Sequence, residues 1–349
     1  MTAPFGRLPL PNALALDLAR PFVPEGLVRA EAWDRIRETA ARVPRGFGYG
    51  CVEVRLDDDD QVDLLLCATT FDHNRETLAE AIAAEELGAV DAVAAIARAW
   101  VTPGHVVHDE MPQLWVEIDH PDGVARPAFA HVRVAPYAPD VAAMRTPRSP
   151  REAWPLIEAG VAATAASRVS AESLRTLRAV CEAAPDTAVL MYVNAPASRG
   201  TDTVRCELAV RAEDLFPTLA AVGWPGDPAP VRALVEAFPA GDRAAFAVVW
   251  TITGGEIEPV LSLEPSVGAP GSPEAWRAVF AVALSRAGAS EEKVRGLHRW
   301  VGCDRVDHPA LGWPATLLRG FDYKLVVGAD GRVRAKAYML YHPRFRLLP

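Results

Sequence analysis

Charged side chains alternate with apolar ones along several stretches of this sequence, and their chemical types suit acid–base catalysis and anion binding. Glu53 and Arg55 alternate with valines, and Glu117 follows Trp115 at the same spacing of two residues. A period of two is typical of a β-strand, so residues at this spacing lie on one face of a sheet. Fixed cations bind phosphate groups, and a carboxylate can accept a proton. The cations that the alternation assigns to the polar face are Arg55, Arg133, Arg205, Lys324, Arg334 and Lys336.

The same face carries aromatic and acidic residues. Aromatic rings attract a positive charge through their faces. The aromatic residues are Trp115, Phe129, Tyr192 and Tyr338, and the acidic residues are Glu53, Asp63, Glu117, Asp119, Glu207, Glu258, Glu264 and Asp322.

The polar face thus has more acids than permanent cations, and two interpretations of this surplus remain open. In the first, Arg55, Lys324, Arg334 and Lys336 gather in one sector, while acids elsewhere face a second substrate or bind Mg²⁺. In the second, the charges form structural ion pairs, and the fold has lost any anion-binding reaction.

Strand-like and helix-like segments must position these residues, and the strands come in pairs. The expected strands are Tyr49–Leu56, Gln61–Thr69, Gln113–His120, Ala128–Ala135, Thr187–Ala195, Asp202–Val210, Arg243–Thr253, Glu256–Glu264, Phe321–Gly328 and Arg332–Tyr341. The expected helices are Glu31–Val43, Arg75 to about Trp100 with one break, Ser149–Ser167, Ser170–Ala184, Glu213–Val222, Pro228–Phe238, Ser272–Ala287 and Ser290–Val301.

This order amounts to five rounds of helix, helix, strand, strand. Parallel α/β folds alternate one strand with one helix, whereas paired strands indicate hairpins and an antiparallel sheet. Ten antiparallel strands rarely stay one open sheet, and closure removes both edges. We therefore expect an α+β fold, a single closed antiparallel ten-stranded barrel of five ααββ repeats with its helices outside. An open sheet with its polar face in water is the alternative, because alternation does not distinguish a barrel interior from solvent.

The last predicted hairpin has the most specific local sequence, FDYKLVVG from Phe321 followed by RAKAY from Arg334. A closing hairpin with a lysine on its first strand and KAY on its second is similar to members of the ABBA-type aromatic prenyltransferases. The repeated ααββ order, from about Glu31 to Tyr341, also resembles their prenyltransferase barrel. The resemblance implies transfer of a prenyl group from a prenyl diphosphate to an aromatic acceptor inside the barrel. It carries over a diphosphate-binding role to Lys324 and, as weaker matches, to Lys336 and Tyr338.

The remaining site residues follow from the strand faces. We expect Arg55, Arg133 and Arg205 to hold the diphosphate with the two lysines, and Glu53 or Glu117 to take up the acceptor's proton. Shielding of the carbocation falls to Trp115, Tyr192 and Tyr338.

The acceptor is expected to be an aromatic small molecule or an aromatic side chain of a precursor peptide, in secondary-metabolite biosynthesis. Mg²⁺ is compatible with this chemistry but is not required by it. The alternatives are a non-catalytic barrel that binds a small molecule or peptide, and a barrel enzyme of unrelated acid–base chemistry.

Two other clusters suggest no metal site. The aspartates from Asp57 to Asp60 fall between two strands and predict a solvated hairpin turn. The segment with His105, His108, Asp109 and Glu110 follows Pro-Gly and is expected to be a loop.

Composition excludes several classes of protein. The 349 residues are 50% hydrophobic and 23% charged, as in a globular protein, and 36 basic against 45 acidic residues give a net charge of −9. An acidic chain without a basic run lacks the footprint of a nucleic-acid-binding protein, and no run of about 18 apolar residues predicts a membrane span. Five scattered cysteines and the N-terminal sequence indicate reduced thiols in the cytoplasm rather than secretion.

We expect residues 1–28 to be an extended N-terminal segment and residues 29–349 to form one domain.

Overall fold

A computed structural model describes residues 10–57, 60–70, 74–87, 94–120, 126–133, 149–165, 168–195, 202–238, 245–266 and 281–344. Its helices are α1 (Asn12–Ala19), η1 (Arg20–Phe22), α2 (Ala30–Ala41), α3 (Asn74–Ala83), α4 (Ala94–Val101), α5 (Val106–Glu110), α6 (Trp154–Ala165), α7 (Ala171–Ala183), α8 (Ala212–Ala221), α9 (Pro228–Val235) and α11 (Glu291–Trp300). Residues 281–286 are also helical.

The strands belong to one antiparallel sheet. They are β1 (Tyr49–Arg55), β2 (Val62–Thr69), β3 (Gln113–Asp119), β4 (Arg126–Arg133), β5 (Val189–Ala195), β6 (Thr203–Arg211), β7 (Ala245–Thr253), β8 (Glu256–Ser266), β9 (Gly302–Val306), β10 (Ala315–Val327) and β11 (Val333–Arg344). Their order is β11-β1-β2-β3-β4-β5-β6-β7-β8-β10-β9, and β10 pairs with β11 in addition to β8.

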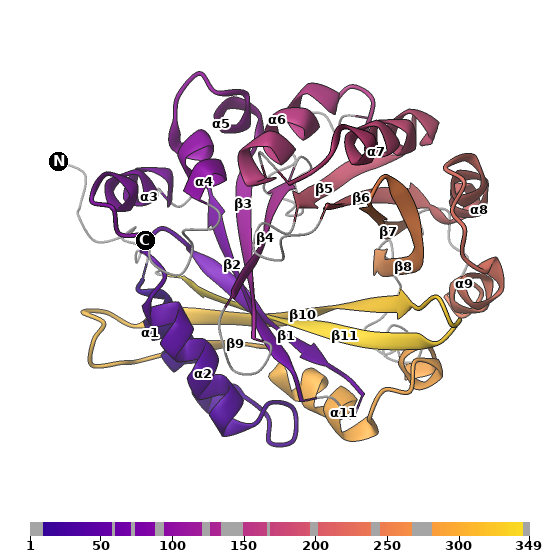
Figure 1. Ribbon diagram of the computed structural model, residues 1–349. Coiled ribbons are helices and arrows are strands. Elements are labelled where there is room, and N and C mark those ends of the chain that lie inside the picture. Colours follow the sequence, from indigo (N-terminus) through magenta and orange to yellow (C-terminus); the bar gives the residue numbers. More distant parts are fainter. Residues whose placement is uncertain are drawn as a thin grey trace.

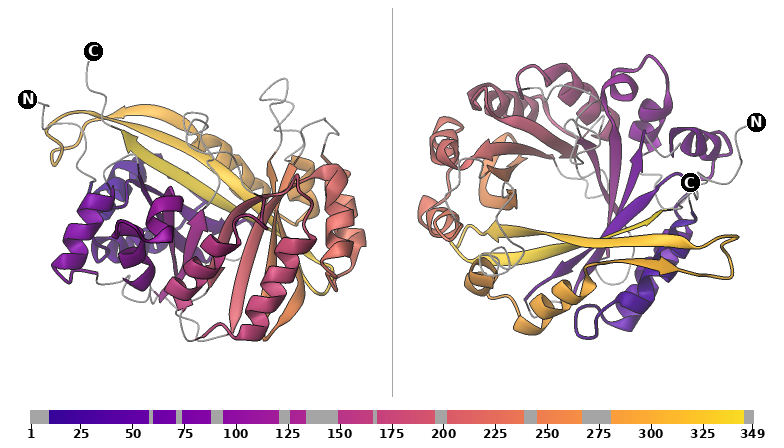
Figure 2. Two further views of the ribbon diagram at one scale, coloured as in Figure 1. Left: turned by 90° about the horizontal axis from the view of Figure 1, so that it is seen from above. Right: turned by 180° about the vertical axis from the view of Figure 1, so that it is seen from behind.

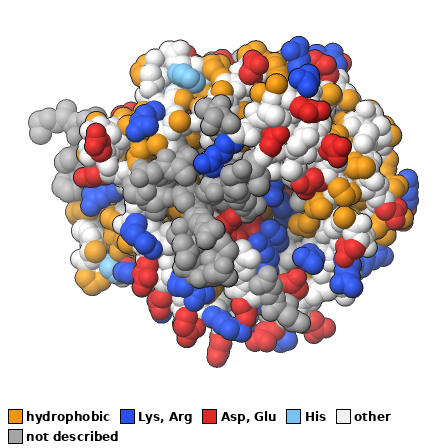
Figure 3. Space-filling model, viewed as in Figure 1, with side chains coloured by type: hydrophobic (Ala, Val, Ile, Leu, Met, Phe, Trp, Pro, Cys, Tyr) orange, Lys and Arg blue, Asp and Glu red, His pale blue; other side chains and the backbone are white. Residues whose placement is uncertain are grey.

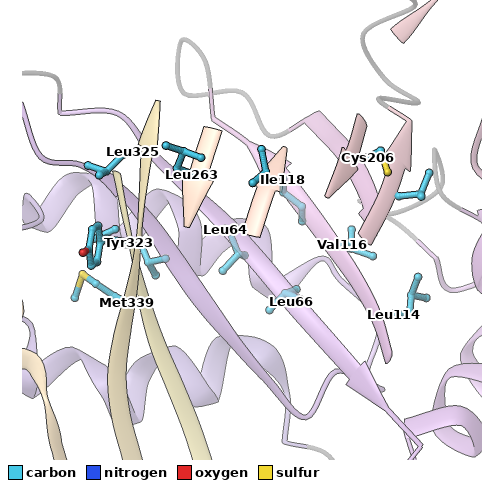
Figure 4. Packing of buried hydrophobic residues seen from close by; sticks show 14 of the residues in the cluster. Leu64, Leu66, Leu114, Val116, Ile118, Cys206, Leu263, Tyr323, Leu325 and Met339 are labelled. Atoms are coloured by element: carbon cyan, nitrogen blue, oxygen red, sulfur yellow. The ribbon is translucent and has the colours of Figure 1, made fainter. Parts of the chain in front are cut away.

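The sheet is strongly curled, and the helices cover its outer face (Figures 1 and 2). This arrangement confirms the prediction of an α+β fold with an antiparallel sheet and outer helices. Alternation along the strands explains it, because the apolar residues of each strand face the helices. Val52 and Val54 of β1, Val116 of β3 and Leu208 of β6 are buried in the main hydrophobic core. Figure 4 shows this packing, in which Leu64 and Leu66 of β2 lie beside Ile118 and Val116 of β3.

Local sequence accounts for the main helices. Helix α2 buries Trp33, Ile36 and Ala40, the stripe expected from its period. Helix α7 begins after Ser170, whose side chain accepts a hydrogen bond from the backbone N–H of Ser173, as the predicted cap requires. In the part of the chain that the structure describes, no helix is long and apolar enough to cross a membrane.

Three features differ from the expectations. Helix α1 lies within residues 1–28, for which we expect an extended segment. The helix forms there because it packs on the rest of the chain: Leu16 and Leu18 are buried, and Asp17 accepts a hydrogen bond from Arg37 of α2 at 2.5 Å. Strand β9 was not predicted, and β10 begins at Ala315 because its first residues pair with β9. Helix α5 replaces the loop expected after Gly104, and the side chain of His105 accepts a hydrogen bond from its first turn.

Candidate functional site

The polar face of the sheet is its inner face, opposite the helices. Along β1, Cys51, Glu53 and Arg55 have the opposite parity to Val52 and Val54 of the helix-covered core. A second, smaller apolar cluster lies on this inner face, separate from the main core, and contains Cys51. Figure 3 shows basic and acidic side chains side by side in the hollow at the centre of the molecule.

Three cations form a row across neighbouring strands on this face. Lys324 of β10 is directly opposite Lys336 of β11, and Lys336 is directly opposite Arg55 of β1. Side chains in directly opposed positions of an antiparallel pair have Cβ atoms about 4.5–5.5 Å apart, and like charges there are destabilising. The fold therefore concentrates positive charge at this cation row, which we define as Arg55, Lys324 and Lys336.

Carboxylates flank the cation row. Nζ of Lys324 lies 2.6 Å from Oε1 of Glu264 and 4.0 Å from Oε2 of Glu207. Nζ of Lys336 donates to Oε1 of Glu53 at 3.0 Å, and the same oxygen accepts a hydrogen bond from Nη1 of Arg55.

Arg55 has a second carboxylate partner on β2. Its Nη2 lies 3.2 Å from Oδ2 of Asp63, which is almost fully buried. Burial raises the pKa of Asp63, although a backbone hydrogen bond from His120 and the charge of Arg55 oppose the rise. Each cation of the row thus has at least one carboxylate within 4.0 Å.

The two lysines of the row differ in acidity. Burial, and then the positive charge of Arg55, lower the pKa of Lys336 to about 7; Lys324 and Arg205 lower it too, against the opposing effect of Glu117. Burial also lowers the pKa of Lys324, but the carboxylates of Glu264 and Glu207 raise it above its ordinary value. The lowered pKa of Lys336 thus reflects its burial first and the neighbouring cations second.

The predicted aromatic residues meet in the inner apolar cluster. Trp115 is buried with Cys51, Leu65 and Cys67, and Tyr192 and Tyr338 pack against them. The ring of Tyr338 lies 5.5 Å below Nζ of Lys324, so it connects the aromatic cluster to the cation row. Burial, together with the charges of Glu264 and Glu117, raises the pKa of its hydroxyl.

Two rings at this cluster, Tyr49 and His342, were not among the site residues predicted from the alternation. Tyr49 packs its ring edge-on against Trp115 at 5.3 Å and stacks on His342 at 4.9 Å. Tyr49 is the first residue of the predicted strand and has the same parity as Glu53, so its place on the inner face could have been predicted from the alternation. His342 lies beyond the predicted end of the last strand, and no local signal extends the strand to it.

The inner face is polar at one end and aromatic at the other. Arg55 is the last residue of β1 and Tyr49 the first, so the two ends are about 20 Å apart at about 3.3 Å per residue. A bound molecule with an anionic head and an apolar body matches this division.

The other predicted residues share the inner face to different extents. Glu117 is half-buried, and its carboxylate influences the pKa values of Lys336 and Tyr338. Arg205 of β6 is half-buried opposite Asn194. Arg133 pairs with Tyr192 through the β4–β5 register, but its side chain lies outside the part of the chain that the structure describes. Arg334 is exposed and does not join the cation row.

The sequence has no match among protein-family models, and no curated protein matches it either. The geometry of the inner face is therefore the basis on which a function is proposed.

Proposed function

We propose that the curled sheet closes into a ten-stranded barrel of the prenyltransferase type. Support comes from the pairings, because β1 to β8 follow one another and β10 and β11 then lead back to β1. On this proposal β9 is an added strand outside the barrel, and the other strands form, with the helices that precede them, five repeats of the ααββ type.

The proposed activity is transfer of a prenyl group from a prenyl diphosphate to an aromatic acceptor. The cation row carries this proposal, since three cations in directly opposed positions favour an anion beside them, and a diphosphate can replace the carboxylates that flank them in the structure. A diphosphate beside Arg55, Lys324 and Lys336 would neutralise that charge in a partly desolvated site. Arg205 and Arg133 complete the proposed diphosphate-binding set from β6 and β4.

In the reaction, the allylic C–O bond breaks and the diphosphate leaves with the electron pair. The faces of Tyr338, Tyr192 and Trp115 stabilise the resulting allylic cation. A carbon of the acceptor ring attacks the cation, and the ring proton then passes to a carboxylate. Glu117 suits this last step better than Glu53, because the Glu53 carboxylate already accepts hydrogen bonds from two cations.

A second candidate function is non-catalytic binding of a small molecule or a peptide. The specific observation in its favour is that every cation of the row has a carboxylate partner, so a diphosphate must displace or rearrange those partners. On this candidate, the ion pairs are structural and the inner face binds ligands without a diphosphate.

Calorimetric titration with dimethylallyl, geranyl and farnesyl diphosphate, with and without Mg²⁺, separates the two candidates. The prenyltransferase proposal requires binding of at least one diphosphate and its consumption when aromatic acceptors are added. Absence of binding to all three refutes it and leaves the non-catalytic barrel.

The Lys324→Ala variant tests the role of the row itself. We expect it to lose turnover at least about a hundredfold, as loss of a fixed charge-stabilising donor does, while its circular dichroism stays that of the parent. Arg332→Ala is the matched control, because Arg332 lies in the turn of the same hairpin with its side chain 81% exposed. Unchanged turnover in the Lys324 variant contradicts the assigned role.

A further inference from the structure

Lysine is rare in this chain, and its positions are informative. Only three of the 36 basic residues are lysines: Lys293, Lys324 and Lys336. Lys293 has a structural role, because its ammonium group donates to the carbonyl oxygens of Arg55 and Asp57 and thereby ties α11 to the end of β1. The other two lysines face each other in the cation row.

Arginine would supply the same charge at positions 324 and 336, and the chain uses arginine almost everywhere else. A lysine differs from an arginine in one chemical respect that matters in a buried site: its amine can lose its proton and act as a nucleophile. The use of lysine at these positions therefore points to a function of the amine itself.

The surroundings of Lys336 favour the neutral amine. Charged groups face it from four other strands: Glu53 and Arg55 of β1, Glu117 of β3, Arg205 of β6 and Lys324 of β10. Of these, three are cations, and one of the two carboxylates, Glu53, is shared with Arg55. The carboxylates of Asp63, Glu207 and Glu264 pair with Arg55 and Lys324, the two neighbours of Lys336. Burial and the neighbouring cations hold its pKa at about 7.

Lys336 also remains accessible. Its side chain is 28% exposed, against 15% for Lys324 and 10% for Lys293. Lys336 thus combines a lowered pKa with the largest exposure of the three lysines, and it lies on the inner face as part of the cation row.

We propose that Lys336 is a nucleophilic amine that captures an aldehyde or ketone carrying an anionic group, as a Schiff base on the inner face of the sheet. Nζ adds to the carbonyl carbon, and a proton from nitrogen passes to the carbonyl oxygen. The resulting carbinolamine then loses water and leaves a C=N bond to Nζ, without any oxidant or reductant. Lys324 and Arg55, which flank Lys336, bind the anionic group of the compound, and the hydrogen bond from Nζ to Glu53 at 3.0 Å orients the amine.

This activity does not depend on the proposed prenyl transfer, since it needs no diphosphate. The two would compete for the same cations, so the two proposals are tested by separate measurements. Schiff-base formation is measured without any prenyl diphosphate. Protection of Lys336 by geranyl diphosphate then reports on the diphosphate site alone.

Pyridoxal 5′-phosphate is a suitable probe, because it has an aldehyde and an anionic group. The whole protein is incubated with it between about pH 6 and about pH 9, reduced with sodium borohydride and digested, and the three lysines are quantified by mass spectrometry. At pH 7 about half of the Lys336 amines are neutral, against roughly one in 2,500 for an ordinary lysine with a pKa near 10.4. We expect modification of Lys336 at least about tenfold faster than that of Lys293 or Lys324, with a half-maximal rate near pH 7.

Two variants control the experiment. Lys336→Arg keeps a positive charge but removes the nucleophile, so the total labelling of the protein must fall to what Lys293 and Lys324 contribute. Arg332→Ala removes an exposed charge from the turn of the same hairpin, outside the cation row, and must leave the labelling of Lys336 within about twofold. Equal labelling of all three lysines, or labelling of Lys336 that rises only near pH 10, overturns the proposal.

Discussion

Replacing Glu53 by glutamine removes one buried negative charge and keeps the size of the side chain. Glu53 is 2% exposed, and one of its oxygens accepts hydrogen bonds from both Arg55 and Lys336. Removal of one partner of a buried ion pair costs about 3–5 kcal/mol, because the other charge stays behind without compensation. Arg55 keeps Asp63 at 3.2 Å, which limits the loss. We therefore expect the free energy of unfolding of Glu53→Gln to fall by about 3 kcal/mol.

Urea unfolding followed by tryptophan fluorescence measures this loss. The matched control is Glu182→Gln in α7, whose carboxylate pairs with Arg178 at 2.8 Å but is 52% exposed. Exposed pairs contribute about 0.2–1 kcal/mol, so the control should lose less than about 1 kcal/mol.

Inorganic diphosphate adds a second readout to the same experiment. In the Glu53→Gln protein Lys336 lacks its carboxylate partner, so diphosphate should stabilise this variant more than the parent at equal concentration. A loss below about 1 kcal/mol for Glu53→Gln, or one equal to that of the control, refutes the view that this carboxylate holds the cation row together.

Two further predictions concern other parts of the chain. Burial lowers the pKa of His120 to about 4, so the unfolded chain binds more protons than the folded one between about pH 4 and pH 6.5. The free energy of unfolding should therefore fall as the pH drops through this window. In urea titrations at several pH values, His120→Gln should make the free energy of unfolding depend less on pH. Ser170→Ala should lower the free energy of unfolding by about 1 kcal/mol in thermal or urea unfolding, because it removes the side-chain cap of α7. The control Ser290→Ala should lower it clearly less, since Ser290 precedes α11 without a side-chain cap hydrogen bond. Equal losses for the two variants would contradict the capping assignment.

Strand positions and strand faces were predictable because they depend on local alternation. The prediction of a strand over Gln113–His120 corresponds to β3 at Gln113–Asp119, and its apolar residues lie in the core. Short elements were less predictable. The sequence of α1, NALALDLA, has leucine at every second position from Leu14 to Leu18, a spacing also typical of a strand, and in the structure α1 is tied to α2 by the Asp17–Arg37 ion pair. The sequence of β9, GCDRV, has little apolar pattern, and its strand form depends on pairing with β10.

For the candidate site, alternation correctly assigned Arg55, Lys324, Lys336 and Tyr338 to one face. It left open whether the charges of this face segregate or pair. The structure has elements of both outcomes: the cations form a row, and carboxylates flank each of them.

The sequence by itself determined which side chains share the inner face, because a period of two is a property of each strand alone. Only the tertiary structure decided which charges meet. Lys336 and Glu53 are 283 residues apart in the chain, and they come within 3.0 Å because β11 pairs with β1 in one register. Electrostatic and hydrogen-bond energies change steeply over a few ångströms, and those distances depend on the register of strands that local sequence does not relate. The acidity of Lys336, and with it the chemistry proposed for the inner face, follows from that register.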